Sequence, residues 1–239
     1  MNKRPRTLDW QSNHDERSRN YPVSEIIENQ GDKKEVLWEE GIVLDQGREG
    51  ACVGFGWMGE VLSEPVSPER QPEFNFANDL AKSYYKRAQK IDQWPGEDYE
   101  GTSVLAGAKI MQEEGYLGEY RWCFGIDDLR DAIINLGPVV IGVPWYESMY
   151  ETDDQGIVVI GGNKVGGHCI LVTGYIPEKE INGEKQEVFR WRNSWGKEYG
   201  IDGSGYVRYT DLDALLKDQG EACIPVERKA PDNHIFKNN

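Results

Sequence analysis

Cys52 has the surroundings that a reactive thiol requires. It follows the glycine-containing segment 46–50 and precedes apolar residues at helical spacing, such as Trp57 and Val61, so we expect it at a helix N-terminus. The unpaired backbone N–H groups and the dipole at such an end favour a thiolate over a thiol. Gln46, six residues earlier, carries an amide that can donate a hydrogen bond to an oxyanion beside the nucleophile. A lone cysteine in apolar surroundings is otherwise a small core residue.

Few residues could serve as the base for this thiol, because the chain has 3 histidines. His168 follows two glycines and opens an apolar run, which places it at the mouth of a strand that can face a helix N-terminus across a cleft. Asn193 can accept a hydrogen bond from one imidazole nitrogen and fix the ring, and Trp195 can cover that bond. The structural alternatives are a strand-capping histidine and a glycine-rich turn with buried aromatic residues.

Taken together and in order, these motifs resemble the papain family of cysteine peptidases. The family pattern is a glutamine, a Gly-Ser-Cys-x-x-Phe motif, a Gly/Asp-His-Ala motif and an Asn-Ser-Trp-Gly motif before a Gly-Tyr strand. The matching residues are Gln46, Gly50-Ala51-Cys52-Val53-Gly54-Phe55, Gly167-His168-Cys169, Asn193-Ser194-Trp195-Gly196 and Gly205-Tyr206. The resemblance covers residues 36–212, most of the chain.

The resemblance implies a role for each matched residue. Cys52 is the expected nucleophile and His168 its base, with Asn193 orienting the histidine and Gln46 helping to hold the oxyanion. The expected substrate-binding residues are Glu100, Gly101, Gly167 and Trp195, because the stretch from Tyr99 to Ser103 resembles the segment that lines the non-primed subsites of relatives. No cofactor or metal is implied.

Several positions depart from the family pattern. Val53 stands where an aromatic residue is usual, and Gly167 replaces the commoner acidic residue before the histidine. Glu49 stands where secreted members carry a disulfide cysteine, which favours a reducing setting. These variants are more similar to bacterial or phage members. The polar segment before the matched region, about 35 residues, is far shorter than the usual inhibitory propeptide, so we expect another means of limiting the activity.

Composition narrows the class of protein further. The net charge of −15 repels phosphates and anionic lipid, which predicts no nucleic-acid or membrane partner. No apolar stretch approaches the ~18 residues of a membrane helix, and no apolar region of signal-peptide type follows the basic N-terminus. We therefore expect a cytoplasmic protein, with a phage-borne origin possible, whose 4 cysteines are free thiols. The sequence leaves the oligomeric state open.

The elements indicate an α+β fold of two lobes, a helical lobe followed by a β-rich lobe, with the active-site cleft between them. Helices are expected from Cys52 to before Pro65, over 76–90, from Thr102 or Ser103 to Gly115, and over 127–137. Strands are expected over 139–143, 157–160, 168–176, 187–191 and 205–209, with a hairpin turn at Asn182-Gly183. The predicted organisation is a polar N-terminal arm (1–35), a catalytic domain (36–225) and a polar C-terminal tail (226–239).

The most specific function that these observations favour is hydrolysis of peptide bonds through a Cys52 thiolate–His168 imidazolium pair and a thioester acyl-enzyme. Its substrates would be peptides or proteins. Two alternatives stay open. One is a non-catalytic papain-fold protein that binds peptides, and the other is an amidase or peptidoglycan hydrolase with the same Cys-His chemistry.

Overall fold

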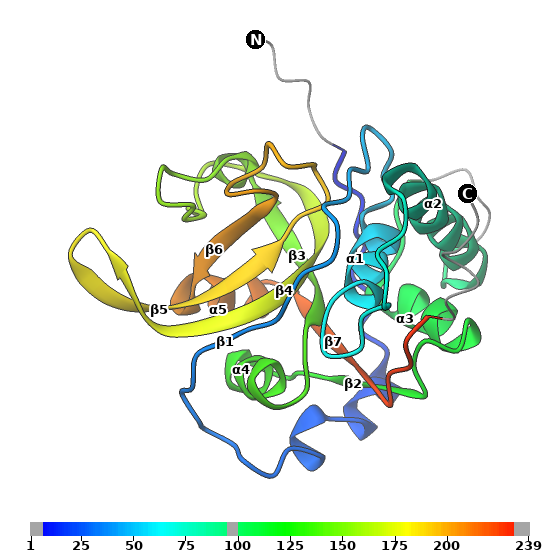
Figure 1. The fold of residues 1–239 in the computed structure, drawn as a ribbon, viewed down its shortest axis with the longest axis horizontal. Helices are drawn as coiled ribbons and strands as arrows, with labels where there is room; N and C mark the ends of the chain where they lie inside the picture. The colour runs from blue at the N-terminus through cyan, green and yellow to red at the C-terminus, as the bar shows by residue number, and fades with distance from the viewer. Residues whose placement is uncertain (1–6, 95–99, 232–239) are drawn as a thin grey trace.

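One antiparallel sheet organises residues 7–94 and 100–231, the parts of the chain that the computed structural model describes (Figure 1). Its strands are β1 (Val36–Leu37), β2 (Glu119–Trp122), β3 (Val139–Tyr146), β4 (Lys164–Ile181), β5 (Glu184–Arg192), β6 (Ser204–Arg208) and β7 (Glu221–Val226). They lie in the order β2-β7-β3-β4-β5-β6, and β1 pairs with β4. With the helices, this is the expected α+β architecture.

The sheet is centred on a long hairpin of β4 and β5, which projects from one side of the molecule in Figure 1. Ile181 pairs with Glu184 across a loop of two residues, Asn182 and Gly183. Both loop residues have positive φ angles, 52° and 83°, as a tight hairpin with the twist of the strands requires. The turn predicted at Asn182-Gly183 is confirmed.

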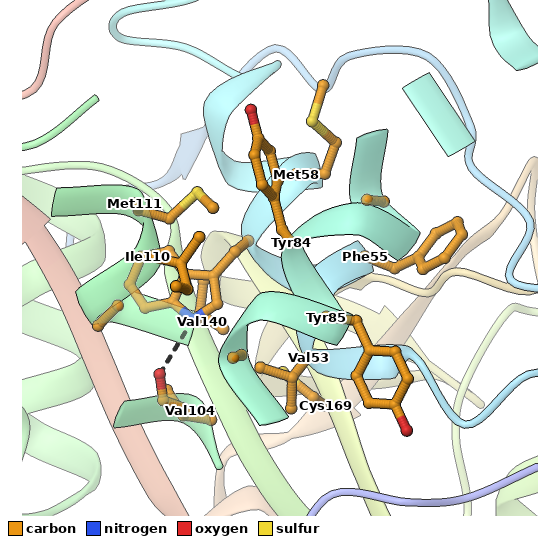
Figure 2. Packing of buried hydrophobic residues seen from close by; sticks show 14 of the residues in the cluster. Val53, Phe55, Met58, Tyr84, Tyr85, Val104, Ile110, Met111, Val140 and Cys169 are labelled. Carbon is orange, nitrogen blue, oxygen red and sulfur yellow. Dashed lines mark hydrogen bonds between the residues drawn. The ribbon is translucent and has the colours of Figure 1, made fainter. Parts of the chain in front are cut away.

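A helical layer packs on one face of the sheet, against β3 and β4. It contains α1 (Cys52–Val61), α2 (Phe74–Ile91) and α3 (Val104–Glu113). Figure 2 shows their buried side chains meeting Val140 from β3 and Cys169 from β4. The Trp57 indole N–H donates to the Val104 carbonyl, 3.1 Å away, and so joins α1 to the start of α3 (dashed in Figure 2). A side-chain cap begins α3, because the Ser103 hydroxyl accepts from the backbone N–H of Ala106.

A second core lies on the opposite face of the sheet, beneath α4 (Ile126–Asn135) and α5 (Tyr209–Lys217). It holds the large aromatic side chains of Trp145, Trp191 and Trp195. Within the described residues, three short 3₁₀ helices complete the fold: Glu16–Asn20, Val23–Glu25 and Glu147–Tyr150. The two hydrophobic clusters correspond to the two lobes that the sequence predicts.

The structure corrects one expected strand and adds several elements. Residues 157–160 form single bridges, Ile157 to Tyr206 and Val158 to Thr152, rather than a strand. Gly156 and Gly162 flank this run with φ angles of 77° and 80°, so the chain turns away before a ladder can extend. The strands β1, β2 and β7, the helix α5 and the 3₁₀ helices were not predicted from the sequence.

Both ends of the described chain pack on the domain. Trp10, Val23 and Ile27, all within the predicted arm, are buried, Trp10 in the helical core and the other two in the sheet core. In the predicted tail, the guanidinium of Arg228 donates to the carbonyl of Glu60 at 2.9 Å, at the end of α1. Residues 1–6 of the arm, Tyr99 and residues 232–239 of the tail lie outside the described residues, and the domain boundaries at 35 and 225 stay predictions. None of the helices in 7–94 and 100–231 has the length and hydropathy to cross a membrane.

Candidate active site

Cys52 is the first residue of α1, as expected, and is fully buried. Ala51 precedes it without a side-chain cap, so the first N–H groups of the helix remain available to the thiol. Burial raises the pKa of the Cys52 thiol, and the nearby backbone of Cys169 in β4 and of Val53 acts in the opposite direction. Since Cys169 directly follows His168, the helix N-terminus lies against β4 at the predicted base.

The hydrogen bond expected between His168 and Asn193 is present. His168 Nε2 lies 2.8 Å from Asn193 Oδ1. The same oxygen accepts from the backbone N–H of Ser194 at 2.8 Å, and a backbone N–H can only donate. Asn193 therefore presents its carbonyl oxygen to the ring, which makes Nε2 the protonated nitrogen and leaves a lone pair on Nδ1. Nδ1 is buried and has no hydrogen-bond partner in the described part of the chain. It is thus free to take a proton.

Two tryptophans enclose this imidazole. The Trp195 ring lies 4.6 Å from the His168 ring, centroid to centroid, at 30°, and the Trp145 ring meets it edge-on at 4.8 Å. Both exclude water from the His168–Asn193 bond, which strengthens it. The sequence predicted the position of Trp195 but not of Trp145. The pairing of β3 with β4 could have indicated the position of Trp145. Val143 pairs with His168, and Trp145 follows two residues later on the same face of the sheet.

Gln46 is buried and held on both sides of its amide group. Its Oε1 accepts from the Ser194 hydroxyl at 2.7 Å, and its Nε2 donates to the carbonyls of Glu49 at 2.9 Å and Thr7 at 3.4 Å. Two carbonyl acceptors identify that atom as the amide nitrogen. The N–H group that the sequence assigned to an oxyanion thus faces a peptide carbonyl from the N-terminal arm.

That arm crosses the candidate site as an extended peptide. The Trp10 N–H donates to the Gly167 carbonyl of β4, and the Gln11 N–H donates to the Thr102 carbonyl before α3, each at 3.0 Å. Between them, the Asp9 backbone lies beside the Cys52 thiol, close enough to affect its pKa. In Figure 1 the same segment, in dark blue, runs alongside α1. We define the docked arm as residues 7–11, which contact both lobes and cover Cys52.

Three of the four residues predicted to bind substrate contact the docked arm. The Glu100 carbonyl accepts from the side chain of Gln11, and the Gly167 carbonyl accepts from the backbone of Trp10. A Cβ atom at Gly101, which has φ +95°, would lie 1.8 Å from the Asp9 carbonyl oxygen, so only glycine admits the arm there. Trp195 instead packs on His168.

With the arm docked, the environment opposes a thiolate–imidazolium pair. Burial raises the pKa of Cys52 to about 12, and the Asp9 carboxylate adds to this effect. Burial lowers the pKa of His168 to about 4, although the hydrogen bond to Asn193 works in the opposite direction. The thiol and the imidazole are therefore both neutral in this state, whereas the sequence predicts an ion pair. An ion pair requires water or substrate in place of the arm.

Docking of the arm is expected to weaken as the pH rises. Burial, together with the nearby Glu100, raises the pKa of Asp9 to about 6, from 3.8 in an ordinary setting. The docked arm therefore holds the Asp9 proton more tightly than the released arm does. Docking is strongest below pH 3.8, the ordinary pKa, and is progressively weakened as the pH rises through about 6, the pKa in the docked state. Because Asp9 is partly exposed, we expect an effect of only several-fold.

The measurement is the rate of Cys52 alkylation by iodoacetamide in the wild type divided by the rate in Asp9→Asn, from pH 4 to pH 7. The ratio cancels the ionisation of the thiol itself and is expected to increase with pH, because the asparagine side chain of the variant cannot ionise. A ratio that stays constant over this range would contradict the role of Asp9.

Among comparisons with known proteins, a family model identifies the family, and a curated relative and solved structures resemble the chain. The family model "Papain family cysteine protease" matches residues 84–221, a segment that includes His168 and Asn193 but begins after Cys52. The viral cathepsin of Spodoptera exigua nuclear polyhedrosis virus is 27% identical over 188 residues, 70% of this chain. The chain spans about half the length of that curated relative, 52%.

Solved structures share the fold. Xylellain, a cysteine protease from Xylella fastidiosa, matches with a TM-score of 0.62 at 19% identity, over 96% of this chain and 100% of its own. The bromelain protease of Ananas comosus, solved in complex with the E64 inhibitor, matches with a TM-score of 0.54 at 13% identity, over 78% of this chain and 94% of its own. At these identities the likeness concerns the fold.

Proposed function

This chain belongs to the papain family of cysteine proteases, and from that premise we propose that it hydrolyses peptide bonds with Cys52 as nucleophile and His168 as base. One observation carries the proposal. The docked arm is an extended peptide with backbone hydrogen bonds to Gly167 on one side and Thr102 on the other, directly over the thiol. A peptide substrate can use the same backbone groups, in the manner of an added strand.

In the proposed mechanism, His168 Nδ1 takes the proton of the Cys52 thiol once the arm has left. The thiolate attacks the carbonyl carbon of the substrate, and the resulting oxyanion is held by the Cys52 backbone N–H and the Gln46 amide. The imidazolium then gives its proton to the leaving amine as the C–N bond breaks, which leaves a thioester. His168 next removes a proton from water as the water oxygen attacks the thioester carbon. The C–S bond then breaks to release the acid, and the imidazolium returns its proton to the Cys52 sulfur.

We also propose that the docked arm keeps the enzyme inactive. It occupies the peptide-binding groups, buries Cys52 and presents the Thr7 carbonyl to the Gln46 amide. Activity then depends on displacement or removal of residues 7–11. This short segment would be the means that limits the activity.

We extend the proposal to a cytoplasmic or otherwise reducing location. All four cysteines are free and buried, and one of them is the proposed nucleophile. Free thiols persist in reducing compartments.

The Cys-His pair is tested by alkylation of Cys52 in a Trp10→Ala protein, chosen to free the site. At pH 5.5 an ordinary thiol of pKa ~8.5 is about 0.1% ionised, roughly a thousandfold less than an ion-paired one. The lower pKa also weakens nucleophilicity, with a Brønsted slope of ~0.4–0.5, which offsets about a hundredfold of that gain. We therefore expect Cys52 to react about tenfold faster than in Trp10→Ala/His168→Gln, as followed by peptide mapping with iodoacetamide.

Hydrolysis is followed in parallel with a pool of fluorogenic peptides and with peptidoglycan fragments, and Cys52→Ala serves as the blank. Equal alkylation with and without His168 would contradict the pair. Fast alkylation without any hydrolysis would favour the peptide-binding alternative, and hydrolysis of the wall fragments alone would favour the amidase alternative.

A further inference from the structure

Backbone groups on one side of the candidate site, in residues 100–102, face the docked arm. The Glu100 carbonyl accepts from the Gln11 side chain at 2.9 Å, and the Thr102 carbonyl accepts from the Gln11 backbone N–H at 3.0 Å. Thr102 also forms a parallel bridge with Trp10. We call residues 100–102 the rim. The rim belongs to none of the strands of the described chain, and all four cysteines are free, so neither sheet pairing nor a disulfide holds it.

The backbone of the middle residue of the rim, Gly101, faces α2 instead of the arm. Its N–H donates to the Tyr85 hydroxyl at 2.9 Å, and its carbonyl accepts from the Gln89 side-chain amide at 3.3 Å. Tyr85 and Gln89 are four positions apart on α2 and therefore lie on the same face of the helix. They are 5% and 8% exposed. Figure 2 shows the Tyr85 hydroxyl directed away from the apolar side chains of the helical core.

These two hydrogen bonds constrain the residues on either side of Gly101. In a planar trans peptide, the C=O of one residue and the N–H of the next point in opposite directions. Because Tyr85 holds the Gly101 N–H toward α2, the Glu100 carbonyl points toward the arm. Because Gln89 holds the Gly101 carbonyl toward α2, the Thr102 N–H points toward the arm as well. Two side chains of α2 thus determine which backbone groups the rim offers to a bound peptide.

A third side chain fixes the far end of the rim. Asp92 is the C-cap residue of α2, and its Oδ2 accepts from the Thr102 hydroxyl at 2.7 Å. Its other oxygen accepts from the Trp94 backbone N–H at 3.0 Å. Thr102 is fully buried, so its hydroxyl needs a partner within the protein. The rim is therefore anchored by one helix and its cap.

We propose that Tyr85 and Gln89 are positioning residues for peptide binding, because they fix the peptide planes through which the rim hydrogen-bonds a substrate backbone. The inference rests on the proposed function and adds two residues that act through the rim. Without the Tyr85 hydroxyl, the peptide between Glu100 and Gly101 is free to rotate, and hydrogen bonds to the bound peptide are lost. Binding is expected to weaken whatever the side chains of the peptide, whereas the intrinsic reactivity of Cys52 is expected to stay the same.

The test is Tyr85→Phe in the Trp10→Ala background, which removes one hydroxyl and keeps the ring. KM for a peptide that the parent protein hydrolyses is expected to rise about threefold to tenfold, with kcat unchanged. Gln89→Met is expected to raise KM by a smaller factor, because the hydrogen bond that it removes is longer. Tyr84→Phe is the matched control. Tyr84 is buried on the same helix, but its hydroxyl bonds to the Tyr116 hydroxyl at 2.8 Å instead of to the rim.

A second readout does not need turnover. A synthetic peptide with the sequence of residues 7–13 is expected to protect Cys52 of the Trp10→Ala protein from iodoacetamide. About threefold to tenfold more of this peptide is expected to be needed in Tyr85→Phe. With the wild-type arm in place, Tyr85→Phe is expected to accelerate Cys52 alkylation several-fold, since the arm uses the same rim, and Tyr84→Phe is expected to leave it unchanged.

The outcomes separate this inference from the proposed function. Unchanged KM and unchanged protection in Tyr85→Phe would overturn the positioning role and leave the peptidase proposal standing. A decrease in kcat, or equal changes in Tyr84→Phe, would indicate a merely structural effect and would also overturn it. Weaker protection in Tyr85→Phe, together with no hydrolysis by the parent protein, would support the positioning role and contradict the proposed function.

Discussion

Replacing Trp10 with alanine is expected to raise both Cys52 alkylation and peptide hydrolysis by about two to three orders of magnitude. Loss of a buried tryptophan typically costs 3–5 kcal/mol, and each ~1.4 kcal/mol changes an equilibrium tenfold. Here the lost free energy is that of arm docking, because the Trp10 side chain is buried in the domain and its indole N–H donates to Glu221. Once the arm is fully released, the rates of alkylation and hydrolysis cannot rise further. The free energy of arm docking therefore sets the largest increase in rate that the substitution can give.

The measurements are the second-order rate constant of Cys52 with iodoacetamide and kcat/KM on a peptide pool. Tyr21→Ala is the matched control, because Tyr21 is an aromatic residue of the N-terminal arm (1–35) that lies outside the docked arm and is 50% exposed. Gly50→Ala tests the same idea without touching Trp10, since its Cβ atom would lie 2.0 Å from the Asp9 carboxylate. If both variants stay folded in thermal melts and react like the wild type, the arm does not limit the activity.

Gln46→Ala in the Trp10→Ala background is expected to lower kcat by about a hundred- to a thousandfold, with a smaller effect on KM. Loss of one oxyanion donor typically costs ~2.7–4 kcal/mol, and the donor acts on charge that develops only in the transition state. Steady-state kinetics on one peptide separates the two constants. The change also removes the buried hydrogen bonds of Gln46, with an expected stability loss of ~1–3 kcal/mol, which a thermal melt detects.

Ser194→Ala is the matched control for Gln46. It removes the hydroxyl that bonds to Gln46 Oε1 and leaves the amide donor in place. A decrease in kcat much smaller than that of Gln46→Ala would separate the donor from its support. A Gln46→Ala protein that retains the kcat of its parent would remove Gln46 from the mechanism.

Local motifs made much of the site predictable. The helix start at Cys52, the hydrogen bond of His168 to Asn193 and the turn at Asn182-Gly183 each depend on residues whose chemistry is visible over a few positions. The structure shows the helix start, the hydrogen bond and the turn as expected, and the catalytic roles of Cys52, His168 and Asn193 stay predictions. In the same way, Ser103 indicated the start of α3 because its side chain caps the helix by itself.

The sequence could not reveal what depends on distant partners. Trp10 stands in a polar segment, and its burial results from Gly142, Gly167 and Glu221, which are more than a hundred residues away. Helix α5 was missed because it follows β6 at Arg208 without a glycine or proline to separate them. Apolar residues at 157–160 indicated a strand, whereas the glycines on either side decided the outcome.

The continuity of the arm with the domain has a consequence for how inhibition ends. A tethered segment faces its site at an effective concentration in the millimolar range for short flexible linkers, regardless of how dilute the protein is. Residues 28–35, which join the packed arm to β1, are all exposed. A cut there would turn a local ligand into a separate peptide, held only by its own contacts and diluted into the surroundings on release. Opening of the intact chain is reversible at any protein concentration, whereas opening after such a cut becomes permanent by dilution.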